Sequence, residues 1–154
     1  MLKAIDIMTR NIISVTPDTG ITEVARLLLE RHINGVPVVD EKGMLVGIIC
    51  QSDLIAQQKK LPLPSFFNLL DIFIPISSPG KIDREVEKIS AFRAEQAMTH
   101  DPVTVNPDTN LEEIAAIMVN RNLHTIPVVE KGKLVGIIGK EDVLRTIMPG
   151  TKGG

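Results

Sequence analysis

The chain has almost no aromatic residues and only one cysteine. Its 154 residues include four Phe but neither Trp nor Tyr, so aliphatic side chains must fill the interior. Few rings are left to stack on the bases of a nucleic acid. Cys50 has no second cysteine with which to form an intrachain disulfide. These two scarcities argue against a base-stacking surface and against a disulfide framework.

Strong charge asymmetry and long apolar runs are also missing. The formal net charge is -2, and no stripe of Lys and Arg provides an electrostatic footprint for nucleic acid. No apolar run approaches the ~20 residues that are needed to span a bilayer. The opening residues Met-Leu-Lys-Ala-Ile-Asp lack the apolar stretch of a signal peptide. We therefore expect a cytoplasmic protein that contacts neither nucleic acid nor membrane.

Sequence motifs of catalysis are absent as well. The sequence has no P-loop, no nucleophile elbow and no Cys/His set with metal-ligand spacing. Its three histidines, His32, His100 and His124, are scattered. His32 falls late in a predicted helix, where a solvated His is usual. We expect no enzyme activity, no metal site and no catalytic cofactor.

The chain does contain one pattern twice, at an offset of 98 − 8 = 90 residues. Residues 8–39 read MTRNIISVTPDTGITEVARLLLERHINGVPVV, and residues 98–129 read MTHDPVTVNPDTNLEEIAAIMVNRNLHTIPVV. The match continues from GMLVGIICQSDL to GKLVGIIGKEDV, with one residue dropped in the second turn. One repeat is too small to bury its own strands. We expect two repeats about a pseudo-two-fold axis, sharing a core, with a groove that has two equivalent mouths.

The sequence pattern of each repeat predicts that its strands and helices follow in the order βαββα. A short extended piece ends at Pro-Asp-Thr, and apolar residues at helical spacing follow, with Thr109 and Glu112 at capping-box spacing. Two apolar strands joined by a glycine turn come next, and a last helix opens beside Asp53 or Asp142. The strands are continuous apolar runs, which indicates that both of their faces are covered.

The motifs Met-Thr, Val-x-Pro-Asp-Thr, Pro-Val-Val, Leu-Val-Gly-Ile-Ile and x-x-x-Asp occur in this order in both repeats. This ordered set resembles the cystathionine-β-synthase-type domain, or CBS domain, and a pair of such domains is a Bateman module. The resemblance implies a mixed α/β (α+β) fold. It also implies a regulatory unit that binds adenosine-containing ligands such as AMP, ADP, ATP or S-adenosylmethionine between the repeats and regulates a partner protein.

The segment between the repeats is too long for a bare loop. Its cluster of apolar side chains around Phe66, Phe67 and Phe73 predicts either cover for the chain's own core or a homodimer or partner surface. The composition after residue 83 predicts a helix. The expected organisation is a first repeat over 1–60, a connector with helical content over 61–93, a second repeat over 94–148 and a flexible tail over 149–154.

In CBS domains a Gly-h-x-Thr/Ser-x-x-Asp segment serves the ribose and phosphate of the ligand, and the Asp accepts hydrogen bonds from the ribose hydroxyls. Here Asp53 and Asp142 hold the Asp position, whereas Cys50 and Gly139 replace the Thr or Ser. This departure leaves two alternatives open. Each Asp can be a plain helix cap, and the chain can be a dimerisation or partner-binding module with no physiological nucleotide.

The resemblance places the adenine side of each site in the opposite repeat. At the second site Glu141 would repel a phosphate, with Lys140 as a partial offset, so we expect a nucleotide to prefer the first site. The second site would then be empty or hold an uncharged adenosine compound. For Thr19 and Thr109 the alternative role is helix capping alone, and for His124 the alternative is an exposed loop position. The first predicted site comprises Asp53, Ser52, Thr109, Leu123, His124 and Thr125, and the second comprises Asp142, Thr19, Ile33, Asn34 and Gly35.

The apolar connector and the resemblance together predict a homodimer with four repeats in total. Sedimentation velocity at micromolar concentration should therefore give the mass of two chains, because so dense an apolar cluster is rarely left exposed on a monomer. A single species with the mass of one chain would contradict this prediction.

Overall fold

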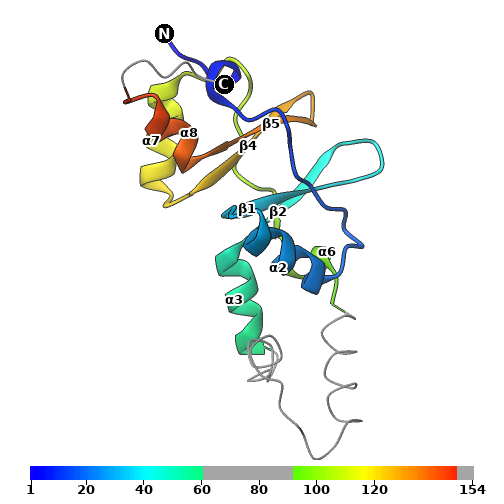
Figure 1. The fold of residues 1–154 in the computed structure, drawn as a ribbon. Helices are drawn as coiled ribbons and strands as arrows, with labels where there is room; N and C mark the ends of the chain where they lie inside the picture. Colours follow the sequence, from blue (N-terminus) through cyan, green and yellow to red (C-terminus); the bar gives the residue numbers. More distant parts are fainter. Residues whose placement is uncertain (61–91, 149–154) are drawn as a thin grey trace, which may run out of the picture.

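The computed structural model describes residues 1–60 and 92–148. Residues 61–91 and 149–154 lie outside the described residues, and with them the predicted Phe cluster, the predicted tail and most of the predicted helical connector. Figure 1 shows two lobes, in which the helices and hairpin of residues 21–60 form one and those of residues 111–145 form the other. Each lobe contains one of the two sequence repeats.

The order of elements within each repeat is the predicted one, and the mixed α/β fold is confirmed. The first repeat contains α2 (Ile21–Glu30), β1 (Gly35–Val39), β2 (Leu45–Cys50) and α3 (Gln51–Lys60). The second contains α7 (Leu111–Asn120), β4 (Thr125–Glu130), β5 (Lys133–Gly139) and α8 (Lys140–Arg145). The extended piece before each first helix is reduced to a single parallel bridge, Val15 with Val38 and Val105 with Val128.

The first helix of each repeat begins later than the Pro-Asp-Thr motif suggests. The predicted capping box of Thr109 and Glu112 is wrong. Asn110 is the N-cap residue, and its side chain accepts a hydrogen bond from the first turn of α7 at 2.9 Å. The Thr109 hydroxyl instead accepts a hydrogen bond from the backbone N–H of Asn106 at 3.1 Å. In the first repeat the Thr19 hydroxyl accepts from the backbone N–H of Thr16 at 3.0 Å. Each threonine thus closes the turn before its helix.

The two hairpins have the same register and meet at their turns. β1 pairs antiparallel with β2, and β4 with β5, with a register shift at the same place in both. Each turn has a glycine in the left-handed region, with φ of 80° at Gly43 and 81° at Gly132. The Leu45 N–H donates to the Gly132 carbonyl at 3.0 Å, and the Leu134 N–H donates to the Gly43 carbonyl at 3.2 Å. Backbone hydrogen bonds therefore join the two repeats.

Two short helices precede one repeat in the sequence but pack on the other. They are α1 (Ala4–Ile7) and α6 (Ala94–Ala97). The first N–H of each helix donates to the threonine carbonyl of the opposite Pro-Asp-Thr turn, Thr109 for α1 and Thr19 for α6, at 2.7 Å in both cases. In Figure 1, α6 accordingly lies beside α2 in the first-repeat lobe. No sequence pattern predicted that each short helix packs on the opposite repeat, an arrangement that we call the exchange.

The residues that follow each short helix continue the exchange. Thr9 pairs with Ile137 of β5 through two backbone hydrogen bonds of 2.8 and 3.0 Å, and β3 (Thr99–His100) pairs with β2. Ile7 and Met8 are buried in the core of the second repeat. The buried side chains form two clusters, and not the one shared core that we expected. Each cluster is completed by a segment that precedes the other repeat.

Two glycines make room for the exchanged segments. A Cβ on Gly136 would overlap the Met8 sulfur and lie 2.8 Å from Met8 Cγ. A Cβ on Gly47 would lie 2.5 Å from the Met98 sulfur and 2.9 Å from the Thr99 carbonyl oxygen. In both repeats the glycine of the Leu-Val-Gly-Ile-Ile motif therefore lies where the exchanged segment crosses that strand.

A fragment of residues 1–60 should show no cooperative unfolding, because its core lacks the Ala94 region and its α1 has nothing to pack on. A 1:1 mixture of fragments 1–60 and 92–154 should recover a cooperative transition, since the mixture contains both partners of each exchange. Circular dichroism during thermal unfolding measures both. A sharp transition for the 1–60 fragment alone would show that the exchange is dispensable.

Candidate functional site

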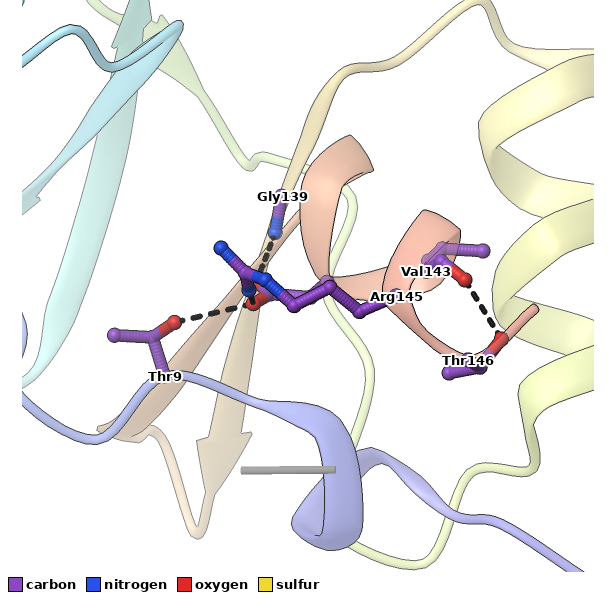
Figure 2. A network of polar contacts seen from close by, with 6 residues as sticks. Thr9, Gly139, Val143, Arg145 and Thr146 are labelled. Atoms are coloured by element: carbon purple, nitrogen blue, oxygen red, sulfur yellow. Dashed lines mark hydrogen bonds and ion pairs between the residues drawn. The ribbon is translucent and has the colours of Figure 1, made fainter. Parts of the chain in front are cut away.

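The Asp142 carboxylate joins three segments of the chain. Its Oδ2 atom accepts the Gly139 N–H at 2.8 Å. Its Oδ1 atom accepts the Thr9 hydroxyl at 3.4 Å and an Arg145 N–H at 2.7 Å. Figure 2 shows the Arg145 side chain reaching from α8 toward Gly139, with Thr9 approaching from the exchanged segment. The carboxylate is therefore a junction between β5, α8 and the N-terminal segment.

The first repeat has the same junction at Asp53. Its Oδ2 atom accepts the Cys50 N–H at 2.7 Å, and its Oδ1 atom accepts the Thr99 hydroxyl at 3.4 Å. The alignment of the repeats places Ala56 where the second repeat has Arg145 (145 − 89 = 56). The two junctions thus share their helix and threonine contacts and differ in one cation.

Each Asp has a capping role and spare capacity for a ligand. Asp142 is the third residue of α8, and its carboxylate accepts the N–H of the N-cap residue Gly139, as in a capping box. The alternative interpretation, that each Asp caps its helix, is therefore correct, but it leaves part of each carboxylate available to a ligand. A carboxylate has about four lone-pair sites, and the described contacts use three at Asp142 and two at Asp53. Neither carboxylate is saturated by the described residues.

A cavity of about 290 Å³ opens at Asp142. Its apolar walls come from both repeats, as Ile13 and Ile33 of the first repeat and Ile137 of the second. Asp142, whose side chain is 10% exposed, lines the cavity beside Arg145, with which it pairs. A largely apolar pocket with a few convergent polar groups is the usual form of a small-molecule site.

The structure brings most of the second predicted site together. Asp142, Ile33, Asn34 and Gly35 line the cavity at Asp142, whereas Thr19 is in the turn that receives α6 and does not line this cavity. Thr125, which we expected at the other site, lines it as well. A Cβ on Gly35 would lie only 3.4 Å from the Thr125 Cβ, so the starts of β1 and β4 lie back to back. We call this contact between the two repeats the seam.

Sequence reasoning missed several residues of this cavity. Thr9 belongs to the exchanged segment, for which the recurring Met-Thr pair was the available signal, and Asn11 and Ile13 follow it in the chain. His32 is not in the helix as expected, because α2 ends at Glu30 and His32 has a positive φ of 53°. Arg145 follows Asp142 by three residues, a spacing that places both on one helix face.

The residues predicted for the first site have different surroundings in the structure. Ser52 and His124 are exposed, and Thr109 is half-buried in its turn. Leu123 packs against the core of the second repeat. The His124 carbonyl accepts the Lys140 N–H at 3.0 Å, which ties this loop to the start of its own last helix.

Burial raises the pKa of the Cys50 thiol to about 11, and the negative charge of Asp53 adds to this effect. A Cβ on Gly35 would lie 3.2 Å from the Cys50 sulfur, so the thiol faces the seam between the repeats. Because the thiolate is the nucleophilic form, Cys50 is a poor nucleophile near neutral pH. The thiol lies where CBS domains have a hydroxyl, and it is a much weaker hydrogen-bond donor.

Two repeats that exchange their first segments, with quasi-equivalent acidic junctions at the seam between them, define a tandem regulatory module. The chain belongs to the CBS domain family, which matches residues 4–60 and 94–149. Within residues 1–60 and 92–148, no group of three or more His, Cys, Asp or Glu is arranged to hold a metal ion.

Several known proteins are similar over nearly the whole chain. The uncharacterized protein MJ1426 of Methanocaldococcus jannaschii is 30% identical over 153 residues, which cover 93% of this chain and 89% of that protein. The chloroplastic CBS domain-containing protein CBSX2 of Arabidopsis thaliana is 30% identical over 150 residues, covering 93% of this chain. The matched part is 62% of that CBSX2 sequence, less than two thirds of its length.

Solved structures of CBS pairs share the fold. The structure of CBSX2 in complex with AMP superposes with a TM-score of 0.72 at 26% identity, covering 96% of both chains. The CBS pair of MJ0100, in complex with 5′-methylthioadenosine and S-adenosyl-L-methionine, has a TM-score of 0.70 at 26% identity, again covering 96% of both chains. In the part of this chain that the structure describes, no helix is long and apolar enough to cross a membrane.

The raised pKa of Cys50 predicts slow alkylation. At pH 8 its thiolate fraction should be about 100-fold lower than that of a thiol with the ordinary value of 9.0. Iodoacetamide labelling followed by mass spectrometry measures the rate, with urea-unfolded protein as the control. A native rate within about threefold of the unfolded rate would contradict the assignment of a buried thiol.

Proposed function

We propose that the chain is a regulatory module that binds adenosine-containing ligands, such as AMP, ADP, ATP or S-adenosylmethionine, at the seam between its repeats. The observation that carries this proposal is the cavity in which the Asp142 carboxylate shares its walls with apolar side chains of the opposite repeat. A carboxylate suits the paired hydroxyls of a ribose, and aliphatic walls suit the faces of a purine ring.

The size of the cavity agrees with a nucleoside. Its volume of about 290 Å³ is close to the lower end of the usual range for small-molecule pockets, roughly 300–1,000 Å³. A ligand the size of a nucleoside would therefore suit it, and longer substituents such as phosphates would extend beyond it. Ile13, Ile33 and Ile137 would cover the base, while Asp142 accepts from the ribose.

The quasi-equivalent junction supports a second binding mouth at Asp53. The contacts of Asp53 with Cys50 and Thr99 repeat those of Asp142 with Gly139 and Thr9 to within 0.1 Å. An adenosine ligand there would lie between α3 and the loop before β4. The residues proposed for this mouth are Asp53, Ser52, Thr109, Leu123, His124 and Thr125.

The ligands of the structural relatives support the same chemical class. AMP is bound to CBSX2, and 5′-methylthioadenosine and S-adenosyl-L-methionine are bound to MJ0100. These three compounds share the adenosine group and differ in charge at the 5′ position. The shared part corresponds to the base and ribose positions that the Asp142 cavity offers.

A second candidate function is dimerisation or partner binding with no physiological nucleotide. Cys50 and Gly139 favour it, because neither offers the hydroxyl that CBS domains present to a phosphate. Under both candidates we propose a homodimer of four repeats that regulates a partner protein. The two candidates differ in one observable, which is whether any adenosine ligand binds.

Isothermal titration calorimetry with AMP, ADP, ATP and S-adenosylmethionine should detect at least one ligand. The Asp142→Asn variant should bind it about 10- to 100-fold more weakly, since a hydrogen bond to a charged carboxylate is worth roughly 1.5–3 kcal/mol. Asparagine keeps one side-chain oxygen for the Gly139 N–H, so the cap of α8 is retained in part.

The matched control is Asp108→Asn, because the Asp108 side chain is 88% exposed and does not line the cavity. This variant should bind like the unmodified chain. Loss of binding in Asp53→Asn with none in Asp142→Asn would place the ligand at the other mouth. No heat with any of the four compounds would leave dimerisation or partner binding as the function.

A further inference from the structure

Arg145 is the charged side chain that contacts the Asp142 carboxylate and has no counterpart at Asp53. Its guanidinium pairs with Asp142 Oδ1 at 2.7 Å and lines the cavity, although its side chain is 57% exposed. The corresponding residue in the first repeat is Ala56. We propose that Arg145 makes the Asp142 cavity selective for adenosine ligands that carry a phosphate, an inference that rests on the function proposed above.

The guanidinium has donors to spare. It carries five N–H groups in a planar fork, and among the described residues its only contact is the one from NH1 to Asp142. An arginine can therefore keep a carboxylate on one edge and hold a phosphate with its remaining N–H groups. No displacement of the ion pair is needed when a phosphate arrives.

The position of Arg145 matches the order of groups along a nucleotide. Ribose and phosphate are neighbours in the ligand, and Asp142 and Arg145 are neighbours in the cavity. The apolar residues Ile13 and Ile33 come from other segments of the wall. A ribose at Asp142 with its base toward the isoleucines would leave the 5′ substituent for the guanidinium.

Other charges of the cavity must be weighed against this cation. Glu141 also lines it and opposes a phosphate, as the sequence analysis expected, and His32 lines it as a further titratable group. The Glu141 side chain is exposed, so water and salt screen its repulsion. Arg145 is held at the carboxylate that would bind the ribose, and direct hydrogen bonds from a guanidinium outweigh a screened like charge. The proposal for this mouth is therefore a ligand with a phosphate, in place of the uncharged compound expected from the sequence.

A structural ion pair within one helix is the competing explanation, and it predicts no effect on ligand choice. The ratio of AMP affinity to adenosine affinity, measured by calorimetry, distinguishes a structural ion pair from a role in ligand selection. Both forms of the chain should carry Asp53→Asn, which removes the carboxylate of the other mouth but keeps an oxygen for the Cys50 N–H. With Arg145 present, AMP should bind at least about tenfold more tightly than adenosine.

Arg145→Ala should weaken AMP binding about 10- to 100-fold and change adenosine binding less than about threefold. Arg145→Lys should retain part of the AMP preference, because it keeps the charge without the fork. Arg121→Ala is the matched control, since Arg121 is an exposed arginine after α7 that does not line the cavity. Its AMP-to-adenosine ratio should not change.

Equal losses of AMP and adenosine in Arg145→Ala, or an unchanged AMP affinity, would overturn the inference and leave the proposed function intact. Binding of adenosine with no preference for AMP in the presence of Arg145 would do the same. Binding of neither compound by the Asp53→Asn chain would overturn the inference, and the titration of the unmodified chain with the four ligands would then decide the proposed function separately.

Discussion

The exchange of the Met-Thr segments is the interaction on which the rest of the structure depends. Met8 lies over Gly136, and Thr9 pairs with Ile137, so the N-terminal segment completes the second repeat. Residues 94–100 complete the first repeat in the same way. Each half is therefore completed by the chain that leads into the other, and we expect neither half to fold on its own.

The same exchange builds the candidate site. Thr9 reaches Asp142 only because its segment crosses β5, and Ile13 becomes a wall of the cavity further along this segment. The opposite repeat contributes Ile33, Asn34 and Gly35. A ligand in this cavity would contact three parts of the chain at once. Its binding energy would therefore act on the relation between the two repeats, which is what a regulatory module requires.

Most of the fold could be predicted from the sequence, because the repeat and its apolar periodicity specify helices and strands locally. Asp142 with Ile33, Asn34 and Gly35 could be predicted as a group from the family resemblance. The exchange could not, since α1 and α6 are only four residues long and carry no periodic signal. Thr125, which was predicted for the first site, also lines the Asp142 cavity because the two strand starts lie back to back, and sequence order does not reveal this. Arg145 was missed because its role depends on a side-chain contact.

The most direct test of the account is hydrogen–deuterium exchange, read by mass spectrometry, with and without saturating AMP. A ligand held at the seam should slow exchange together in three separate stretches, residues 8–13, 32–35 and 139–145, because each contributes to the cavity. Residues 111–120, which form α7 outside the cavity, should change little. Protection confined to a single repeat, or absent from residues 8–13, would contradict a site built by the exchanged segment.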